Sequence, residues 1–324
     1  MMRRLSAVAV LAAALVVSGC SAGGARDVSG DLATHDPALV QEDGVWYVYS
    51  TGNGTVSDGN VQIRSSRDGV DWRYRGEVWD DKPEWIGERL RGVDNLWAPE
   101  LVEHDGTWYL YYSASVFGKN TSVIALATNV TLAPDDPDYE WVDQGVVMES
   151  DAGDDFNAID AGIVEDAEGT PWMAFGSFWS GIRMVELEWP SGKRADDAEP
   201  LRLADRRTPP NAIEAPYIVE HDGDYFLFVS RDSCCQGVKS TYNVAVGRAD
   251  APQGPYLDRD GVPLLEDGGT PVLAGEGARI GPGGQFVFGD TLAVHYYDAE
   301  LGGAFQLALL PITWDADGWP TVHW

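Results

Sequence analysis

A short phrase occurs four times in the chain, as His35-Asp36-Pro37-Ala38-Leu39-Val40, Ala98-Pro99-Glu100-Leu101-Val102, Ala158-Ile159-Asp160-Ala161-Gly162-Ile163-Val164 and Ala212-Ile213-Glu214-Ala215-Pro216-Tyr217-Ile218-Val219. Each copy carries one acid beside a small residue or proline, and a second apolar run rich in aromatic residues follows it. The four acids are 64, 60 and 54 residues apart. This spacing exceeds that of solenoid repeats and fits a four-stranded propeller blade. We expect the acids to hold the same position in every unit and to converge on one axis.

The residues between the acids predict short strands joined by turns. In the first unit, Glu42-Asp43-Gly44 is a hairpin signal between two apolar runs. A fifth, weaker unit begins at Gly281-Pro282-Gly283-Gly284-Gln285, where Gln285 takes the place of the acid. The chain is therefore predicted to be an all-β, five-bladed β-propeller. Two β-sandwiches would explain the strands but not the recurring acid.

The expected strands are 37–41, 45–50, 61–66 and 72–78 in the first unit; 101–103, 108–113, 122–128 and 139–144 in the second; 162–165, 172–176, 182–187 and 201–204 in the third; 217–220, 225–230 and 242–247 in the fourth; and 286–288, 291–297, 304–311 and 321–324 in the fifth.

Composition restricts the class of partner. The 324 residues are 44% hydrophobic, and they include 13 Trp, 13 Tyr and 37 Gly, as β-structure with many turns requires. The net charge of −30 disfavours nucleic acid, because phosphate binding needs clustered Lys and Arg. Solubility accounts for most of the acidic residues. We expect a monomer with no nucleic-acid partner.

The N-terminus predicts export. Residues 1–19 combine a basic start at Arg3 and Arg4 with an apolar stretch too short to span a membrane comfortably. Val17-Ser18-Gly19-Cys20 resembles the lipobox of bacterial lipoproteins, in which Cys20 would be lipidated. Ordinary secretion with a spare cysteine is the alternative. We expect a flexible tether over 20–31, a propeller over 32–324, and a protein that is lipid-anchored at the cell surface or extracellular.

Two further cysteines, Cys234 and Cys235, are adjacent in the sequence. In an exported protein they either form a disulfide between neighbours or remain two free thiols, and the sequence leaves both open. No CxxC motif for metal binding or redox chemistry is present.

The recurring acids suggest glycoside hydrolysis. This reaction needs a protonated acid at the leaving oxygen and a carboxylate that activates water or attacks carbon. Asp36 and Glu214 come from non-adjacent units and are expected to face each other across a bound sugar. Asp160 would raise the pKa of the acid by like-charge proximity. A single acid at a strand end usually caps backbone N–H groups, and Glu100 remains open between that role and chemistry.

Several motifs carry a resemblance to a known family: HDPAL at 35–39, NLWAPEL at 95–101, NAIDAG at 157–162, NAIEAPY at 211–217, SFWSGI at 177–182, RDSCCQGVKSTY at 231–242, GPGGQ at 281–285 and HYYD at 295–298. They resemble the signatures of glycoside hydrolase family 43, and most closely its endo-α-1,5-L-arabinanases. The resemblance implies a five-bladed propeller and single-displacement hydrolysis with inversion. It makes Asp36 the general base, Glu214 the general acid, and Asp160 the residue that tunes and orients the acid. Ala161 departs from the proline that family members often carry.

The resemblance also implies contacts to arabinan or an arabino-oligosaccharide. The expected substrate-binding residues are Trp97, Phe117, Gly118, Asn157, Ser177, Phe178, Trp179, Cys234 and Cys235. His295 matches a histidine that, in arabinanases, binds a Ca²⁺-like ion near the propeller axis through a shell made mostly of water. From the residue alone, a hydrogen-bonded core histidine is the simpler reading, since Ca²⁺ prefers oxygen ligands. No organic cofactor is expected.

Three activities remain open at this stage. An endo-acting arabinanase is favoured, because the sequence lacks the additional C-terminal β-sandwich common in xylosidase-type members. An exo-acting α-L-arabinofuranosidase or β-xylosidase of the same family is the alternative. A non-catalytic arabinan-binding lipoprotein would be expected to lack one of the three catalytic carboxylates.

Overall fold

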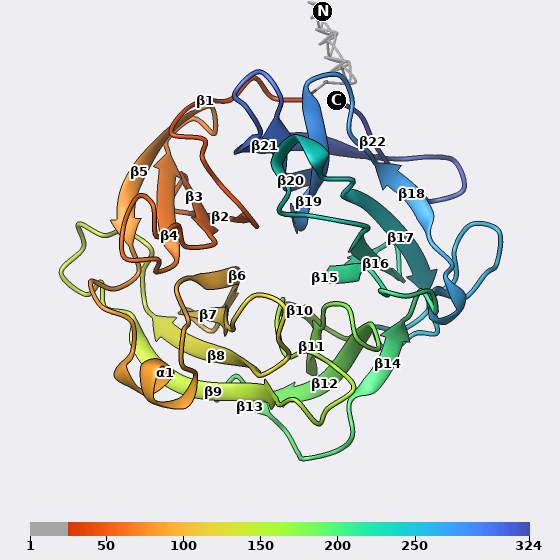
Figure 1. Cartoon of the computed structure of the whole chain (residues 1–324), viewed down its shortest axis with the longest axis horizontal. Coiled ribbons are helices and arrows are strands. Elements are labelled where there is room, and N and C mark those ends of the chain that lie inside the picture. Colours follow the sequence, from red (N-terminus) through yellow and green to blue (C-terminus); the bar gives the residue numbers. More distant parts are fainter. Residues whose placement is uncertain (1–24) are drawn as a thin grey trace, which may run out of the picture.

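The computed structural model describes residues 25–324, and in it five β-sheets surround a central axis (Figure 1). The predicted signal peptide and Cys20 lie outside the described residues. The five-bladed propeller predicted from the repeats is confirmed, and the two-sandwich alternative is excluded. None of the helices in residues 25–324 is long and apolar enough to cross a membrane.

The blades follow one another along the chain. Blade 1 contains β1 (Ser29–Gly30), β2 (Ala38–Glu42), β3 (Val45–Ser50), β4 (Gln62–Ser66) and β5 (Asp71–Glu77); blade 2 contains β6 (Leu96–His104), β7 (Thr107–Ala114), β8 (Ser122–Asn129) and β9 (Val142–Ser150); blade 3 contains β10 (Gly162–Glu165), β11 (Pro171–Phe175), β12 (Ile182–Glu188), β13 (Lys193–Arg194) and β14 (Leu201–Ala204); blade 4 contains β15 (Ile213–His221), β16 (Asp224–Arg231), β17 (Asn243–Ala249) and β18 (Thr270–Leu273); blade 5 contains β19 (Arg279–Phe288), β20 (Thr291–Asp298), β21 (Ala304–Trp314) and β22 (Pro320–Val322). The helices are α1 (Glu84–Arg89) and two 3₁₀ turns, η1 (Gly237–Lys239) and η2 (Leu264–Glu266).

The first long strand of every blade, namely β2, β6, β10, β15 or β19, lies nearest the axis, and the later strands step outward (Figure 1). Three of the inner hairpins close on the same Asp-Gly turn, at Asp43-Gly44, Asp105-Gly106 and Asp222-Gly223. Both residues of each pair have positive φ, which is the requirement of a type I′ turn. Apolar side chains on the two faces of each sheet then pack blade against blade, so the core is divided among the interfaces between blades.

Several strands differ from the prediction. The short strands β1 and β13 were not predicted, and β6, β15 and β19 begin at Leu96, Ile213 and Arg279, before the expected starts at 101, 217 and 286. The outer strand of blade 4, β18, was not predicted, because its four residues include a proline and follow two glycines. Strand β9 begins at Val142, although 139–144 was expected. The aromatic residues that suggested the earlier start belong to the preceding loop, from which Trp141 packs edge-on against Tyr49 of blade 1.

The predicted tether is shorter than expected. Ser29 and Gly30 pair in parallel with β5, and the backbone N–H of Arg26 donates to the carbonyl of Leu309 in blade 5. The segment 25–31 therefore lies on the propeller and links its last blade to its first, and the assignment of these residues to a flexible tether was wrong.

Candidate active site

One backbone conformation recurs at the inner strand of every blade. The left-handed residues are Asp36 (φ 50°), Ala98 (φ 41°), Asp160 (φ 60°), Ala215 (φ 50°) and Gly284 (φ 58°). The pairing register shifts at these points in blades 2, 4 and 5, so each inner strand bends where it reaches the axis.

The expectation that all four acids hold the same position in their units was wrong. Asp36 and Asp160 are left-handed residues themselves, whereas Glu214 precedes the left-handed residue of its blade and Glu100 follows its own by two positions. Gln285 follows Gly284 and likewise does not replace an acid. Successive side chains of an extended strand point in different directions. The carboxylates therefore reach the axis at different depths, and this offset lets them occupy different environments.

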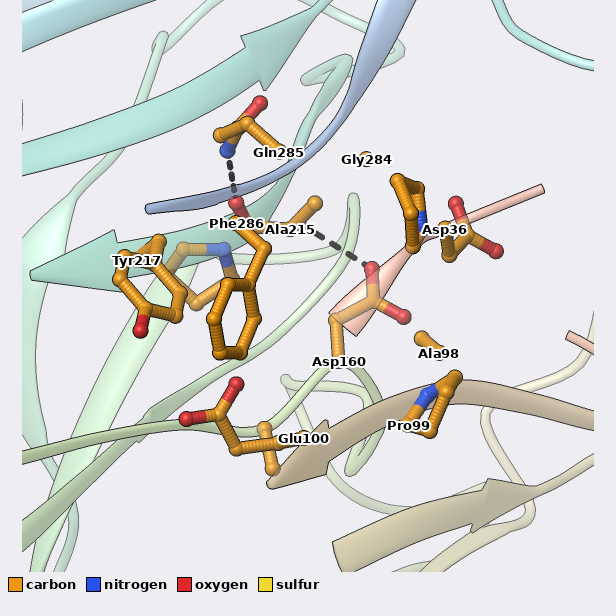
Figure 2. A pocket seen from close by; sticks show the side chains of 13 residues that line it. Asp36, Ala98, Pro99, Glu100, Asp160, Ala215, Tyr217, Gly284, Gln285 and Phe286 are labelled. Atoms are coloured by element: carbon orange, nitrogen blue, oxygen red, sulfur yellow. Dashed lines mark hydrogen bonds between the residues drawn. The ribbon is translucent and has the colours of Figure 1, made fainter. Parts of the chain in front are cut away.

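The inner strands enclose an axial cavity of about 30 Å³, enough for a water molecule. Asp36, Glu100 and Asp160 all line it (Figure 2). Glu100 is buried beside Tyr217 and accepts a long hydrogen bond (3.4 Å) from the backbone N–H of Ile163. Burial raises the pKa of Glu100 well above its usual value. Of the two roles left open for Glu100, this contact matches that of satisfying a backbone donor.

Asp36 is held as a charged carboxylate. Its Oδ2 accepts hydrogen bonds from Nδ1 of His35 (2.8 Å) and from the hydroxyl of Thr51 (2.6 Å). Burial raises the pKa of Asp36, but the charge interaction and hydrogen bond with His35, aided by Thr51, outweigh it and hold the pKa below its usual range. Because Oδ2 is occupied by two donors, Oδ1 is the oxygen left to accept a proton.

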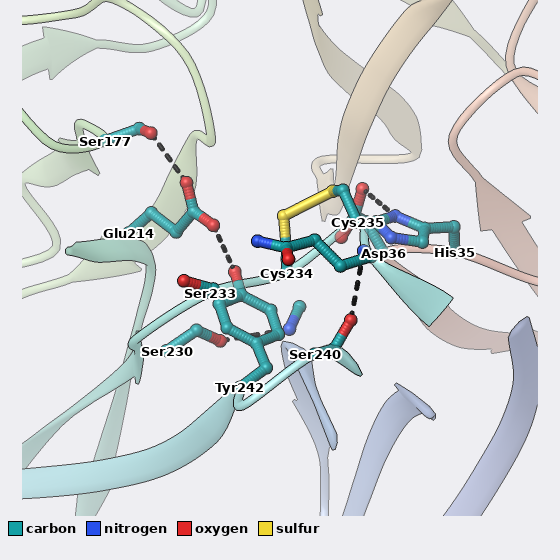
Figure 3. Close-up of a disulfide and its surroundings, with 12 residues drawn as sticks. His35, Asp36, Ser177, Glu214, Ser230, Ser233, Cys234, Cys235, Ser240 and Tyr242 are labelled. Carbon is teal, nitrogen blue, oxygen red and sulfur yellow. Dashed lines mark hydrogen bonds and ion pairs between the residues drawn. A yellow bond between two sulfur atoms is a disulfide. The ribbon is translucent and has the colours of Figure 1, made fainter. Parts of the chain in front are cut away.

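Glu214 has the opposite environment. Its side chain is buried, with Oε2 accepting from the hydroxyl of Ser177 (2.6 Å) and Oε1 from that of Tyr242 (2.7 Å; Figure 3). Burial raises the pKa of Glu214, and the two hydrogen bonds only partly offset this. Burial therefore favours the protonated form of Glu214.

Asp160 couples to Glu214 through the next residue. Its Oδ2 accepts the backbone N–H of Ala215 (3.1 Å), and its own N–H donates to Ser113 (3.0 Å). Burial, followed by repulsion from Glu214 and Asp36, raises the pKa of Asp160 well above its usual value. Burial together with like-charge repulsion therefore favours a proton on the Asp160–Glu214 pair.

His295 is fully buried and stacks on His35, with ring centroids 3.7 Å apart. Nitrogen or oxygen atoms of His35, Asp36 and His295 lie within 4.8 Å of one another, and Nε2 of His295 has no hydrogen-bond partner among residues 25–324. Burial lowers the pKa of His295 well below its usual value, so the ring is neutral.

A cation at Nε2 needs the lone pair of that nitrogen, so the ring proton must then lie on Nδ1. In the observed arrangement, Nδ1 of His295 accepts the backbone N–H of Asp36 at 3.1 Å, and it lies 3.5 Å from Oδ1 of the same residue. A proton on Nδ1 would face that carboxylate oxygen instead. Nε2 is therefore available to a cation only in the tautomer that gives up the hydrogen bond from the backbone N–H of Asp36.

The expected substrate-binding residues fall into two groups. Ser177 contacts Glu214, and Phe178, through its N–H, donates to the carbonyl of Ile213, so this loop supports the acid directly. Asn157 is buried and accepts a hydrogen bond from Ser122. The remaining members are Trp97 (half-buried), Phe117 (77% exposed), Gly118 (exposed) and Trp179 (39% exposed). Their contact with a sugar stays a prediction.

The cysteines form the vicinal disulfide that was one of the two alternatives. Cys234 and Cys235 are linked to each other, and Cys235 is exposed (Figure 3). Sequence reasoning missed the residues that hold the carboxylates, namely His35, Thr51, Ser113, Tyr242 and Tyr297. His35 lay inside a repeat, beside the acid that it contacts. Tyr242 and Tyr297 lay inside the quoted motifs at 231–242 and 295–298, but no contact with a carboxylate was predicted for them.

Comparison with known proteins identifies the family of the chain. The profile of glycosyl hydrolases family 43 matches residues 29–320, nearly the whole of the described chain. The chain belongs to this family. It is thus a glycoside hydrolase, as the resemblance in its motifs implied.

Individual relatives are similar over most of their length. The chain is 38% identical to the extracellular exo-α-(1→5)-L-arabinofuranosidase ArbA of Cellvibrio japonicus, covering 98% of this chain and 91% of the relative. It is 36% identical to the extracellular endo-α-(1→5)-L-arabinanase 1 of Bacillus subtilis, covering 97% and 95%. The structure of a GH43 endo-arabinanase from Bacillus licheniformis superposes with a TM-score of 0.86 at 38% identity, covering 91% of this chain and 99% of the other.

Proposed function

We propose that this protein hydrolyses α-1,5-L-arabinofuranosidic linkages inside arabinan chains, with inversion at the anomeric carbon. The observation that carries the proposal is the opposite tuning of two carboxyl groups. The pKa of Asp36 is held below its usual range, while that of Glu214 is raised by burial. Two titratable groups whose environments push their pKa values apart are the pattern of an acid and base pair.

The proposed reaction follows from these protonation states. Glu214 gives its proton to the glycosidic oxygen as the bond to the anomeric carbon breaks. Asp36 takes a proton on Oδ1 from a water that attacks the opposite face of the sugar. Asp160 keeps a proton on the acid pair and fixes the backbone after Glu214 through the N–H of Ala215. Two carboxyl groups that leave room for a water between them give inversion.

The substrate is proposed from the relatives, two of which carry α-(1→5)-L-arabinan activities in their names. The test is linear arabinan incubated with wild type, Asp36→Ala and Glu214→Ala. Wild type should release arabino-oligosaccharides, and both variants should be inactive. An NMR spectrum of the first product should show the β-anomer, because the linkage cleaved is α; first appearance of the α-anomer would contradict inversion.

An exo-acting enzyme is the second candidate, since the relative from Cellvibrio japonicus is an exo-α-(1→5)-L-arabinofuranosidase. The two modes differ in their earliest products. Endo action on linear arabinan gives a spread of short oligomers while most chains are still long. Exo action gives a single short product from the chain end from the first time point. A binding protein would bind arabinan with no product at all.

We also propose that the protein is exported and anchored through a lipid on Cys20, as the lipobox-like sequence indicates. Two relatives are extracellular by name, which supports export. In a bacterial host fed with labelled fatty acid, wild type should carry the label and fractionate with membranes, and Cys20→Ser should do neither. Unlabelled wild type in the medium would contradict the anchor. Sedimentation of the chain without residues 1–24 should give a monomer.

We further propose that Nε2 of His295 is one ligand of a Ca²⁺-like cation whose other ligands are mainly water. The support is the orphaned, buried nitrogen beside Asp36. The cation would supply positive charge near the centre of the site, while Asp36 remains the group that activates water.

A further inference from the structure

A run of hydrogen bonds connects the disulfide to the candidate base. The backbone N–H of Cys235 donates to the hydroxyl oxygen of Tyr297 at 2.8 Å. That hydroxyl lies 2.9 Å from Nε2 of His35, and Nδ1 of His35 lies 2.8 Å from Oδ2 of Asp36. Figure 3 shows the disulfide lying beside His35 and Asp36. Three segments far apart in the sequence thus meet in one chain of contacts.

The two ends of the run fix the direction of every bond in it. A backbone N–H can only donate, and a charged carboxylate can only accept. Because Oδ2 of Asp36 can only accept, Nδ1 of a neutral His35 carries the ring proton. Nε2 of His35 then accepts the proton of Tyr297, whose oxygen accepts from Cys235. In the neutral form of the ring, the proton on Nδ1 is donated to Asp36. This series of hydrogen bonds therefore selects the tautomer of His35 that donates to the carboxylate of Asp36.

The disulfide fixes the first donor. A bond between the sulfur atoms of adjacent cysteines closes an eight-membered ring that contains the peptide bond between them. The N–H that donates to Tyr297 belongs to that peptide bond, so it cannot rotate away freely. Cys235 also has a left-handed backbone (φ 64°), a conformation that non-glycine residues seldom adopt without a local constraint.

Packing also restricts the orientation of the His35 ring. Its ring stacks on His295 with centroids 3.7 Å apart and meets the edge of Phe305 at 5.4 Å. Packing thus fixes the plane of the ring, and the hydrogen bond from Tyr297 selects which nitrogen carries the proton.

We propose that Cys235, Tyr297 and His35 form a positioning relay for Asp36, in which the disulfide-held amide orients Tyr297 and Tyr297 keeps the proton of His35 on the nitrogen facing the base. With Oδ2 held by His35 and Thr51, Oδ1 is the oxygen presented to the attacking water. Tyr297 and Cys235 touch no reacting atom in this role and act only through Asp36. The kinetic consequences rest on the hydrolysis proposed above, whereas the tautomer does not.

The first test is spectroscopic and needs no substrate. Nitrogen-15 NMR at alkaline pH, where the imidazoles are neutral, reports which ring nitrogen carries the proton. His35 should be protonated on Nδ1 in wild type. In Tyr297→Phe the fraction with the proton on Nε2 should rise. Tyr296→Phe is the matched control, because it removes the hydroxyl of the preceding residue on the same strand, β20, and should leave the His35 spectrum unchanged.

The second test is kinetic. With linear arabinan, Tyr297→Phe should lower kcat about tenfold, the effect of weakening one hydrogen bond to a charged group, with KM unchanged within about twofold. Tyr296→Phe should keep wild-type kcat. Replacing both Cys234 and Cys235 by serine opens the ring and should also lower kcat. Because Cys235, Tyr297 and His35 act through one series of hydrogen bonds, adding Tyr297→Phe to the serine variant should cause no further loss of kcat.

Each outcome decides the proposal. A Tyr297→Phe variant with wild-type kcat and an unchanged His35 tautomer overturns it. So does a fall in kcat that comes with an equal rise in KM and a lower unfolding temperature, or losses that multiply in the combined variant, because these indicate independent structural roles. If wild type cleaves no arabinan but the tautomer changes in Tyr297→Phe, the relay stands and the proposed function is wrong.

Discussion

The replacement Glu214→Gln tests the assignment of the general acid with the least change of shape. The amide can keep the hydrogen bond from Tyr242 on its oxygen, and Ser177, which donates to the other oxygen at 2.6 Å, can rotate to accept from the new NH₂ group. The variant should therefore fold and bind arabinan as the wild type does. It cannot supply a proton to the leaving oxygen.

The magnitude follows from that missing proton. General acid catalysis contributes about 10²–10⁴ in rate, or about 3–5 kcal/mol of barrier, so kcat on arabinan should fall by that factor. An arabino-oligosaccharide with a dinitrophenyl leaving group needs little protonation, and on it the variant should stay within about tenfold of wild type. Glu220→Gln is the matched control, because it makes the same change at an exposed position of the same strand, β15.

The assay is initial-rate kinetics on both substrates together with arabinan binding by calorimetry. The assignment of Glu214 as the general acid is refuted if kcat falls equally on both substrates in Glu214→Gln, because a missing proton donor affects poor leaving groups most. It is also refuted if binding is lost while turnover per bound chain is normal. Either result would make Glu214 a residue that shapes the site and give the acid role to another carboxyl group.

Three other predictions follow from the same contacts. Gly284→Ala should lower kcat about 10²-fold, because a Cβ at this position would overlap Oδ1 of Asp36 and displace it. Gly289→Ala is the control and should keep wild-type activity, because Gly289 is also left-handed but has open space around it. Equal losses in the two variants would contradict this explanation. Tyr242→Phe removes a hydrogen bond that lowers the pKa of Glu214, so that pKa should rise and the alkaline limb of kcat/KM should move to higher pH; a fixed or lowered limb would be inconsistent with the assignment. A chelator should lower the unfolding temperature of wild type by roughly 5 °C and leave His295→Ala unchanged, while indifference of wild type would remove the cation from the site.

Much of the fold could be predicted from the sequence, because its signals are local. The turns at Asp43-Gly44 and Asp222-Gly223 fix hairpins within a few residues, and the repeat length indicates blades. The outer strand β18 was not predicted, because pairing with β17, rather than its own strand propensity, makes it a strand. The position of residues 25–31 on the propeller was not predicted, because their partners lie in blades 1 and 5 and no local pattern reveals such contacts.

The candidate site was predicted in part for a similar reason. The acids Asp36, Asp160 and Glu214 stand in repeated phrases and could be found by their type. The one-residue offset of Glu214 could not, because it depends on which residue of each phrase adopts the left-handed conformation. The groups that set the pKa values, such as Thr51 and Tyr242, come from other strands and loops, and the fold alone brings them to the carboxylates.

The most direct test of the acid and base assignment is a crystal structure of Glu214→Gln with an arabino-oligosaccharide bound. We expect one glycosidic oxygen within about 2.6–3.2 Å of the side chain at position 214 and, on the opposite face of the sugar, a water hydrogen-bonded to Oδ1 of Asp36. An oligosaccharide bound away from both residues, or with the two carboxyl positions on the same face of the ring, would contradict it.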